Sequence, residues 1–196
     1  FTFLIVGSFE ASLVRPFVEG YLASRTSQQE DERWRDLGIE RPGGVITETV
    51  EKGIEARSRV SLVFHGPYEW SQQENLVLRS AASALQTRLR EVIREEEGGT
   101  YGIGVWASPS RYPDSQYLVH ITFGTSPARA RELADRVFSV VGEITEDGLD
   151  PSYAERVKTT QSEEYEKDIR TNGYWMSRLR GFYFHDLDPA RTQDYP

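Results

Sequence analysis

Residues 89–105 read LREVIREEEGGTYGIGV and join two segments that have different hydrophobic periods. The first segment continues an amphipathic helix, and the glycine pair at 98–99 is typical of a helix end, where glycine adopts the left-handed conformation. The second segment begins at Tyr101 and reads as a strand. Because the reversal brings the last helical turn close to the start of the strand, we expect Arg94 and Tyr101 at the same end of a sheet.

The flanking sequence alternates between strand patterns and helix patterns. A capping box at Ser71–Glu74 starts the preceding helix, and Ser126-Pro127 and Asp150-Pro151 mark two further helix starts. In chain order the sequence predicts a strand at 1–7, a helix at 13–22, a loop at 24–44, strands at 45–50 and around 60–64, a helix from 71 that ends at 97–99, strands at 101–107 and 117–123, helices at 130–144 and 155–169, and an aromatic helical segment after 171–173.

This order of elements, β-α-β-β-α-β-β-α-α, predicts an α+β fold with a mainly antiparallel mixed sheet covered by helices. No linker is long enough to divide the chain, so we expect a single α+β domain over residues 1–196. The chain opens directly on an apolar strand pattern without a methionine and closes on loop-like residues 188–191. We therefore expect it to be a fragment of a larger multidomain protein.

Composition excludes several classes of protein. The 196 residues include 23 basic and 31 acidic side chains, and the resulting net charge of -8 argues against a nucleic-acid-binding protein. No apolar run reaches the roughly 18–20 residues of a membrane span. The hydrophobic fraction of 38% is too high for a disordered tail, and the absence of cysteine excludes a disulfide framework and a thiol nucleophile.

Metal-binding and nucleophilic motifs have little support in the sequence. His65, His120 and His185 are far apart, and none has a second ligand at helical spacing, so structural or surface roles are the main alternative to a metal site. The run Glu95–Glu97 is read as a solvated helix end. The sequence has no G-x-S-x-G elbow and no phosphate-binding loop, because Gly102-x-Gly104 falls within a predicted strand.

Arg94 and Tyr101 remain as candidate binding residues. A guanidinium and a phenol both donate hydrogen bonds, so the pair suits a peptide carbonyl or carboxylate. The alternative is structural: Arg94 extends along the surface, and Tyr101 packs as an ordinary strand residue.

Three stretches together resemble the second-type, C-terminal and noncatalytic domain of pitrilysin/insulinase-family zinc metallopeptidases. Residues 1–9 (FTFLIVGSF) are similar to its opening strand, and residues 89–101 are similar to its signature helix and turn. Residues 170–175 (RTNGYW) resemble a stretch of the bacterial zinc-protease branch. The resemblance covers nearly the whole chain in matching order, and it implies a metallopeptidase-type α/β sandwich domain.

In that family, two halves of similar domains close around a chamber, and one half carries an inverted zinc motif, H-x-x-E-H. The other half supplies an arginine and a tyrosine seven residues apart that hold and polarise the bound peptide. The resemblance therefore implies that Arg94 and Tyr101 bind substrate. The motif H-x-x-E-H is absent from this sequence, so we expect no catalytic residue, no zinc site and no activity in this chain alone.

The resemblance also implies the partners. We expect companion domains or a second subunit that carry the zinc, a peptide substrate, no nucleic acid, and a homodimer when this chain is isolated with its domain-facing surfaces bare. It suggests a periplasmic or otherwise exported bacterial location. Two alternatives stay open: a protease-derived scaffold or interaction domain without hydrolytic activity, and a free-standing small-ligand domain of ferredoxin-like type.

Overall fold

The computed structural model describes residues 2–26, 35–96, 100 and 102–194. The chain forms two compact units: one combines Phe1–Trp34 with Thr160–Tyr195, and the other is Arg35–Thr159. The expectation of one domain over residues 1–196 stays a prediction. No helix within the described ranges is both long enough and apolar enough to cross a membrane.

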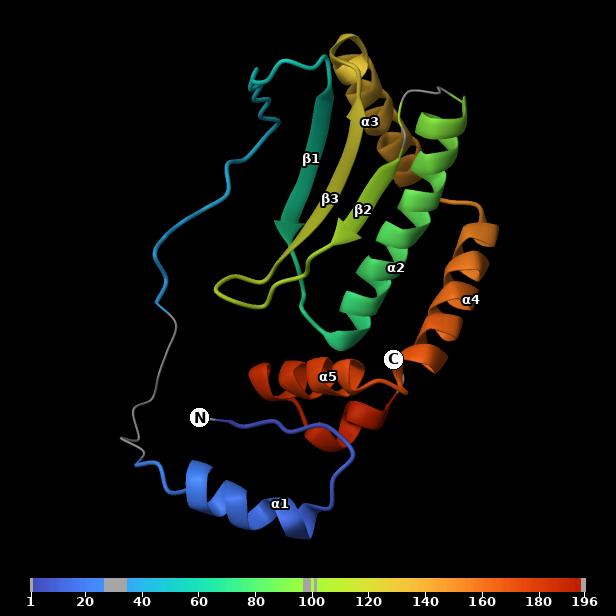
Figure 1. Cartoon of the computed structure of the whole chain (residues 1–196). Coiled ribbons are helices and arrows are strands. Elements are labelled where there is room, and N and C mark those ends of the chain that lie inside the picture. The colour runs from blue at the N-terminus through green and yellow to red at the C-terminus, as the bar shows by residue number, and fades with distance from the viewer. Residues whose placement is uncertain (1, 27–34, 97–99, 101, 195–196) are drawn as a thin grey trace. The chain divides into compact units, whose positions relative to one another are not determined.

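Three antiparallel strands form the sheet of the Arg35–Thr159 unit (Figure 1). In spatial order they are β1 (Ser58–Pro67), β3 (Gln116–Thr125) and β2 (Ile103–Ala107). Val63 of β1 and Trp106 of β2 both pair with His120 of β3, so these residues form one row across the sheet. The predicted α+β class and the three later strands are confirmed, apart from Tyr101, which lies outside the described residues.

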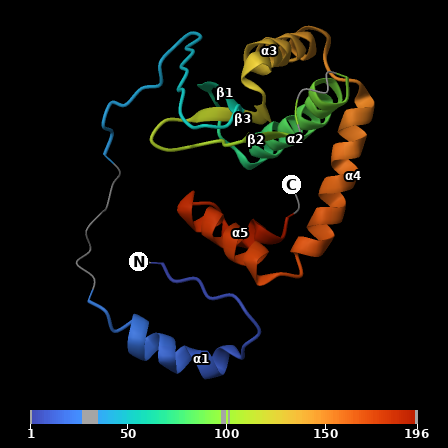
Figure 2. The same ribbon diagram turned by 45° about the horizontal axis from the view of Figure 1, so that its top comes forward.

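One face of the sheet is covered by helices α2 (Gln72–Leu89) and α3 (Ala130–Asp147), as Figures 1 and 2 show. The core is formed by apolar side chains from both helices, from the segment after α2 and from the covered face of β2 and β3: Ala82, Leu89, Val92, Ile93, Ile103, Val105, Ile121, Phe123, Leu133, Val137 and Val140. Burial of this apolar surface is the main term that stabilises the unit. The opposite face includes Val63 and Trp106, which are 47% and 45% exposed.

Two of the three predicted helix starts are confirmed by their caps. The Ser71 hydroxyl accepts a hydrogen bond from the Glu74 amide at 3.0 Å, as the capping box requires. The Asp150 carboxylate accepts one from the Ser152 amide at 2.8 Å and starts α4 (Pro151–Asp168). At Ser126 the cap differs, because its side chain makes no capping bond and Pro127–Arg129 forms a 3-10 turn, η3, before α3 begins.

The β2 edge of the sheet is partly covered by α2. The Val105 amide on β2 donates to the Gln86 side chain of α2 at 2.9 Å, so a helix side chain satisfies part of that edge. A covered edge of this kind is less open to pairing with another strand. At the other end of the strands, Gly66 of β1 lies against the Tyr117 ring, and a Cβ at Gly66 would come within 2.9 Å of that ring.

The second unit is mostly helical. It contains α1 (Ala11–Phe17), the π-helical η1 (Val18–Leu22), the end of α4, α5 (Asn172–Phe184) and the 3-10 turn η4 (Pro189–Gln193). Thr171 caps α5 by accepting from the Tyr174 amide at 3.2 Å, and the Trp175 indole donates to the Ile169 carbonyl at 2.8 Å. Residues 170–175 therefore form the turn that ends α4 and starts α5.

Two predicted strands, 1–7 and 45–50, are wrong in this structure. The described residues of both segments form no strand, and Phe3, Val45 and Val50 are 50%, 83% and 87% exposed. Alternating apolar residues indicate a segment that can pair, but a strand also needs a neighbour with free backbone groups, which the pattern does not specify. The helix at 13–22 is confirmed as α1 and η1, although Leu13 and Phe17 on its apolar stripe are exposed.

Candidate functional site

Arg94 lies in η2 (Arg90–Glu96), a π-helical continuation of α2. Its side chain is exposed, and within the described part of the chain the guanidinium makes no ion pair. Tyr101 lies outside the described residues, so the expected approach of Arg94 and Tyr101 stays a prediction. The neighbouring Thr100 hydroxyl bridges the Gly102 carbonyl and amide, at 3.0 and 3.2 Å, just before β2.

Burial anchors the segment that carries Arg94. Leu89, Val92 and Ile93 are fully buried in the core, at 0% exposure. Residues three and four positions apart share one face of a helix, so this face points inward and Arg94 is left on the outer side. Short π-helical segments are frequent at functional sites.

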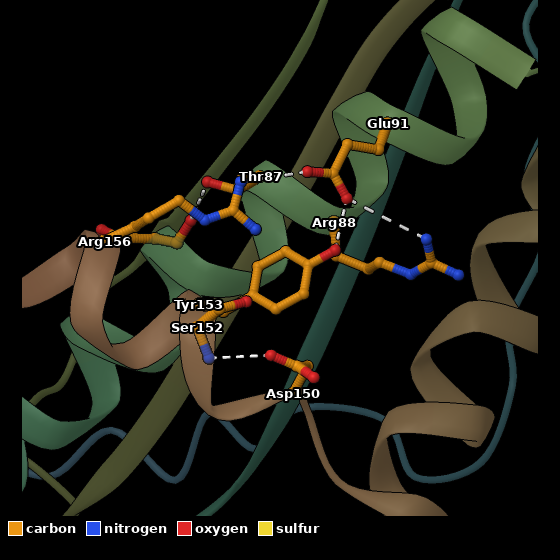
Figure 3. Close-up of polar contacts among 8 residues, drawn as sticks. Thr87, Arg88, Glu91, Asp150, Ser152, Tyr153 and Arg156 are labelled. Atoms are coloured by element: carbon orange, nitrogen blue, oxygen red, sulfur yellow. Dashed lines mark hydrogen bonds and ion pairs between the residues drawn. The ribbon is translucent and has the colours of Figure 1, made fainter.

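A polar cluster holds the other flank of η2 (Figure 3). The Glu91 carboxylate accepts a hydrogen bond from the Tyr153 hydroxyl and forms ion pairs with Arg156, at 3.2 Å, and with Arg88, at 4.0 Å. The Arg156 guanidinium also lies over the Tyr153 ring, 4.3 Å from its centroid. These contacts connect the start of α4 to η2, three residues before Arg94.

The contacts in and beside this cluster shift the pKa values of Tyr153 and of the nearby Asp150. Desolvation by burial raises the pKa of Tyr153, and the hydrogen bond and charge of Glu91 raise it further. Hydrogen bonds from the side chain and backbone of Ser152 hold the pKa of Asp150 below its ordinary value of 3.8. Near neutral pH Tyr153 is thus a neutral donor and Asp150 is an anionic helix cap.

The histidines and glutamates do not assemble a metal site in the described residues. His65 contacts the Pro42 carbonyl at 3.3 Å, His120 stacks on Trp106, and His185 follows α5 in the other unit. No group of three or more candidate ligands converges among the side chains that the structure describes. Those of Glu95–Glu97 fall outside the described set.

Sequence reasoning missed the Glu91 cluster. The chain spacing between Glu91 and Tyr153 carries no local signal, because their contact depends on how α4 packs. Only the i,i+3 pair of Arg88 and Glu91 could have been read from the sequence.

A family model described as "Peptidase M16 inactive domain" matches residues 1–161. The probable zinc protease PqqL of Haemophilus influenzae is 24% identical over 196 residues, which are 100% of this chain and 21% of that protein. The chain thus spans about a fifth of the length of this curated relative. A domain described as inactive fits a chain without a catalytic zinc motif.

Two solved structures share the fold. The periplasmic protease PqqL from Escherichia coli superposes with a TM-score of 0.78 and 17% identity, over 96% of this chain and 21% of that one. The ferredoxin protease FusC, solved in complex with Arabidopsis ferredoxin, gives a TM-score of 0.72 and 18% identity, over 95% of this chain and 20% of that one. Both relatives are longer proteins in which a domain of this kind is one part.

Proposed function

The chain belongs to the family of peptidase M16 inactive domains, and from this membership we propose that it is the noncatalytic, substrate-binding domain of a zinc metalloendopeptidase. In this proposal it helps to form a closed chamber, and Arg94 and Tyr101 hold and polarise the bound peptide. The zinc belongs to a companion domain or subunit. This chain's contribution is to orient the peptide.

The exposed position of Arg94 on a firmly anchored helix end is the observation that carries the proposal. A guanidinium presents five N–H donors in a fixed fork, which matches a carbonyl or carboxylate oxygen. The helix backbone at Arg94 is held on one side by the buried side chains of Leu89, Val92 and Ile93. On the other side it is held by the contacts of Glu91 with α4. Because the backbone is anchored before the substrate arrives, only the freedom of the side chain itself is lost on binding.

Tyr101 supplies the second donor in the proposal. It follows Arg94 by seven residues across the glycine pair. A phenol that donates to the same peptide group would strengthen polarisation of the carbonyl, and a preorganised donor of this kind contributes about 3 kcal/mol in a transition state.

The location and the catalytic partner are also proposals. The Escherichia coli relative is a periplasmic protease, and the Haemophilus influenzae relative is named a probable zinc protease. We infer a periplasmic bacterial enzyme in which the residues outside this chain perform the hydrolysis.

The test is peptide cleavage by the complete protein carrying Arg94→Ala, with Arg90→Ala as the matched control. Arg90 lies in the same π-helical segment and is also exposed. We expect Arg94→Ala to lower kcat/KM by about 10- to 100-fold, roughly 1.4–2.7 kcal/mol, and Arg90→Ala to leave it within about twofold. Tyr101→Phe should lower kcat about 100-fold.

Equal kcat/KM values for the two arginine variants would refute the assigned role of Arg94. A complete protein that contains no zinc and cleaves no peptide would instead support the scaffold function.

A further inference from the structure

The face of the sheet opposite α2 and α3 carries an aromatic and basic surface, which we call the open face. It is formed by the exposed or partly exposed side chains that alternate away from the core: Arg59, Ser61, Val63 and His65 on β1, His120 and Thr122 on β3, and Trp106 on β2. Leu118 of β3 alternates to the same face but is buried. We propose that the open face binds an extended, acidic polypeptide segment through an aromatic residue that contacts Trp106 and a carboxylate that pairs with Arg59. The inference rests on the proposed substrate-binding role and names the substrate class.

The aromatic part of the open face is preorganised. The Trp106 and His120 rings are parallel, with 3° between their planes and 5.0 Å between their centroids. Stacking restricts the Trp106 rotamer while the side chain stays 45% exposed, so a ligand ring meets a fixed surface.

The charge of the open face is opposite to that of the chain. The three strands contain no aspartate or glutamate, whereas the whole chain has 31 acidic residues and a net charge of -8. Arg59 is exposed, and its Nε donates to the Thr122 hydroxyl at 3.2 Å, which fixes the guanidinium and uses one of its five donors. His65 and His120 add no negative charge, so the strands favour an acidic ligand.

The distance between Trp106 and the Arg59 guanidinium sets the distance between the aromatic residue and the carboxylate of the ligand. The Arg59 guanidinium is held at Thr122 on β3, two residues along that strand from His120, which shares its row with Trp106. With a rise of about 3.3 Å per residue and strands about 4.8 Å apart, Thr122 and Trp106 are roughly 8 Å apart. An extended peptide spans that distance in two to three residues, so its aromatic residue and its carboxylate should be separated by about two intervening residues.

The experiment measures binding of fluorescent ten-residue peptides to the complete protein by anisotropy, with a zinc chelator present so that no peptide is cleaved. One peptide has a phenylalanine, two Gly/Ser residues and two glutamates in that order. A second replaces both glutamates with lysine, and a third replaces the phenylalanine with alanine. We expect the first peptide to bind at least tenfold more tightly than either of the others.

Substitutions on the open face test whether the first peptide binds there. Trp106→Ala and Arg59→Glu should each weaken the first peptide five- to tenfold, and Trp106→Phe should retain most of the affinity. The matched controls are Tyr183→Ala, which removes another half-exposed aromatic ring, and Arg131→Glu, which makes the same charge change on α3. Circular dichroism checks that each variant is folded.

Equal affinity for the three peptides, or wild-type affinity in Trp106→Ala and Arg59→Glu, would overturn the inference. Arg94→Ala separates it from the proposed function, because that variant should lose cleavage and keep binding to the open face. A protein that binds the first peptide as expected but never cleaves would refute the protease role alone.

Discussion

The Tyr153 hydroxyl donates a hydrogen bond to the Glu91 carboxylate, which connects two residues 62 positions apart in the sequence. This bond joins the start of α4 to the π-helical segment that carries Arg94. Glu91 is only about one-third exposed, so a hydrogen bond to its charge contributes more than an ordinary surface contact. The packing of α4 thereby affects the position of Arg94.

Removal of this bond should destabilise the protein. Tyr153→Phe leaves Glu91 with its two arginines but without the phenol donor, and we expect the free energy of unfolding to fall by about 1–2 kcal/mol. Urea denaturation measures it, with Tyr183→Phe as a control on a half-exposed tyrosine. Identical unfolding midpoints for the two variants would show that the bond contributes nothing.

Acid should weaken the start of α4 through Asp150. Its pKa is lower in the folded state than its ordinary value of 3.8, so its stabilising effect is present above that value and is lost as the pH falls through the folded pKa. Asp150→Asn keeps a good capping residue and removes the titration. We expect the melting temperature of the variant to fall less than that of the wild type between pH 5 and about pH 2–3. Parallel curves would contradict this.

Gly66 should not tolerate a side chain. A Cβ there would lie 2.9 Å from the Tyr117 ring, closer than such contacts allow, so Gly66→Ala should cost about 1–3 kcal/mol. Gly142, inside α3, has no atom within 4 Å of the same position, and Gly142→Ala should stabilise by about 0.5–1 kcal/mol. Thermal unfolding of both variants checks the opposite signs, and a neutral Gly66→Ala would refute the close packing.

The isolated 196-residue chain should self-associate. Ile39, Val45 and Val50 are more than 80% exposed, and large apolar surfaces left in water favour association. Sedimentation at increasing concentration should show dimers or larger species, reduced when all three residues are replaced by serine. A monomer at every concentration would disprove this prediction.

The sequence predicted the elements that have strong local signals. Ser71 and Asp150 were identified as helix starts because capping depends on residues within one turn. The strands around His120 were identified by their alternation. The strands predicted at 1–7 and 45–50 are wrong for their described residues, because pairing depends on which sheet edge is free. The Glu91 cluster was missed because Tyr153 and Arg156 come from a distant helix.

For Arg94, part of the candidate site follows from the sequence. The helix that carries it and the buried face of that helix could be read from the apolar period. Its hydrogen-bonding pattern could not, since a π-helical segment differs from an α-helix by one residue and leaves little trace in the hydrophobic pattern.

The one-residue difference between the π-helical segment η2 and a regular α-helix affects the alignment of this sequence with those of relatives. It also affects what a deletion in this segment would do. A relative with a regular α-helix over the same stretch would need a one-residue alignment gap between Arg90 and Arg94, although both sequences look continuous. Deletion of one residue there would turn the following side chains by about 100° around the helix axis. The direction of the Arg94 guanidinium is therefore a property of chain length as well as of residue type, and an insertion or deletion could redirect it with every other residue unchanged.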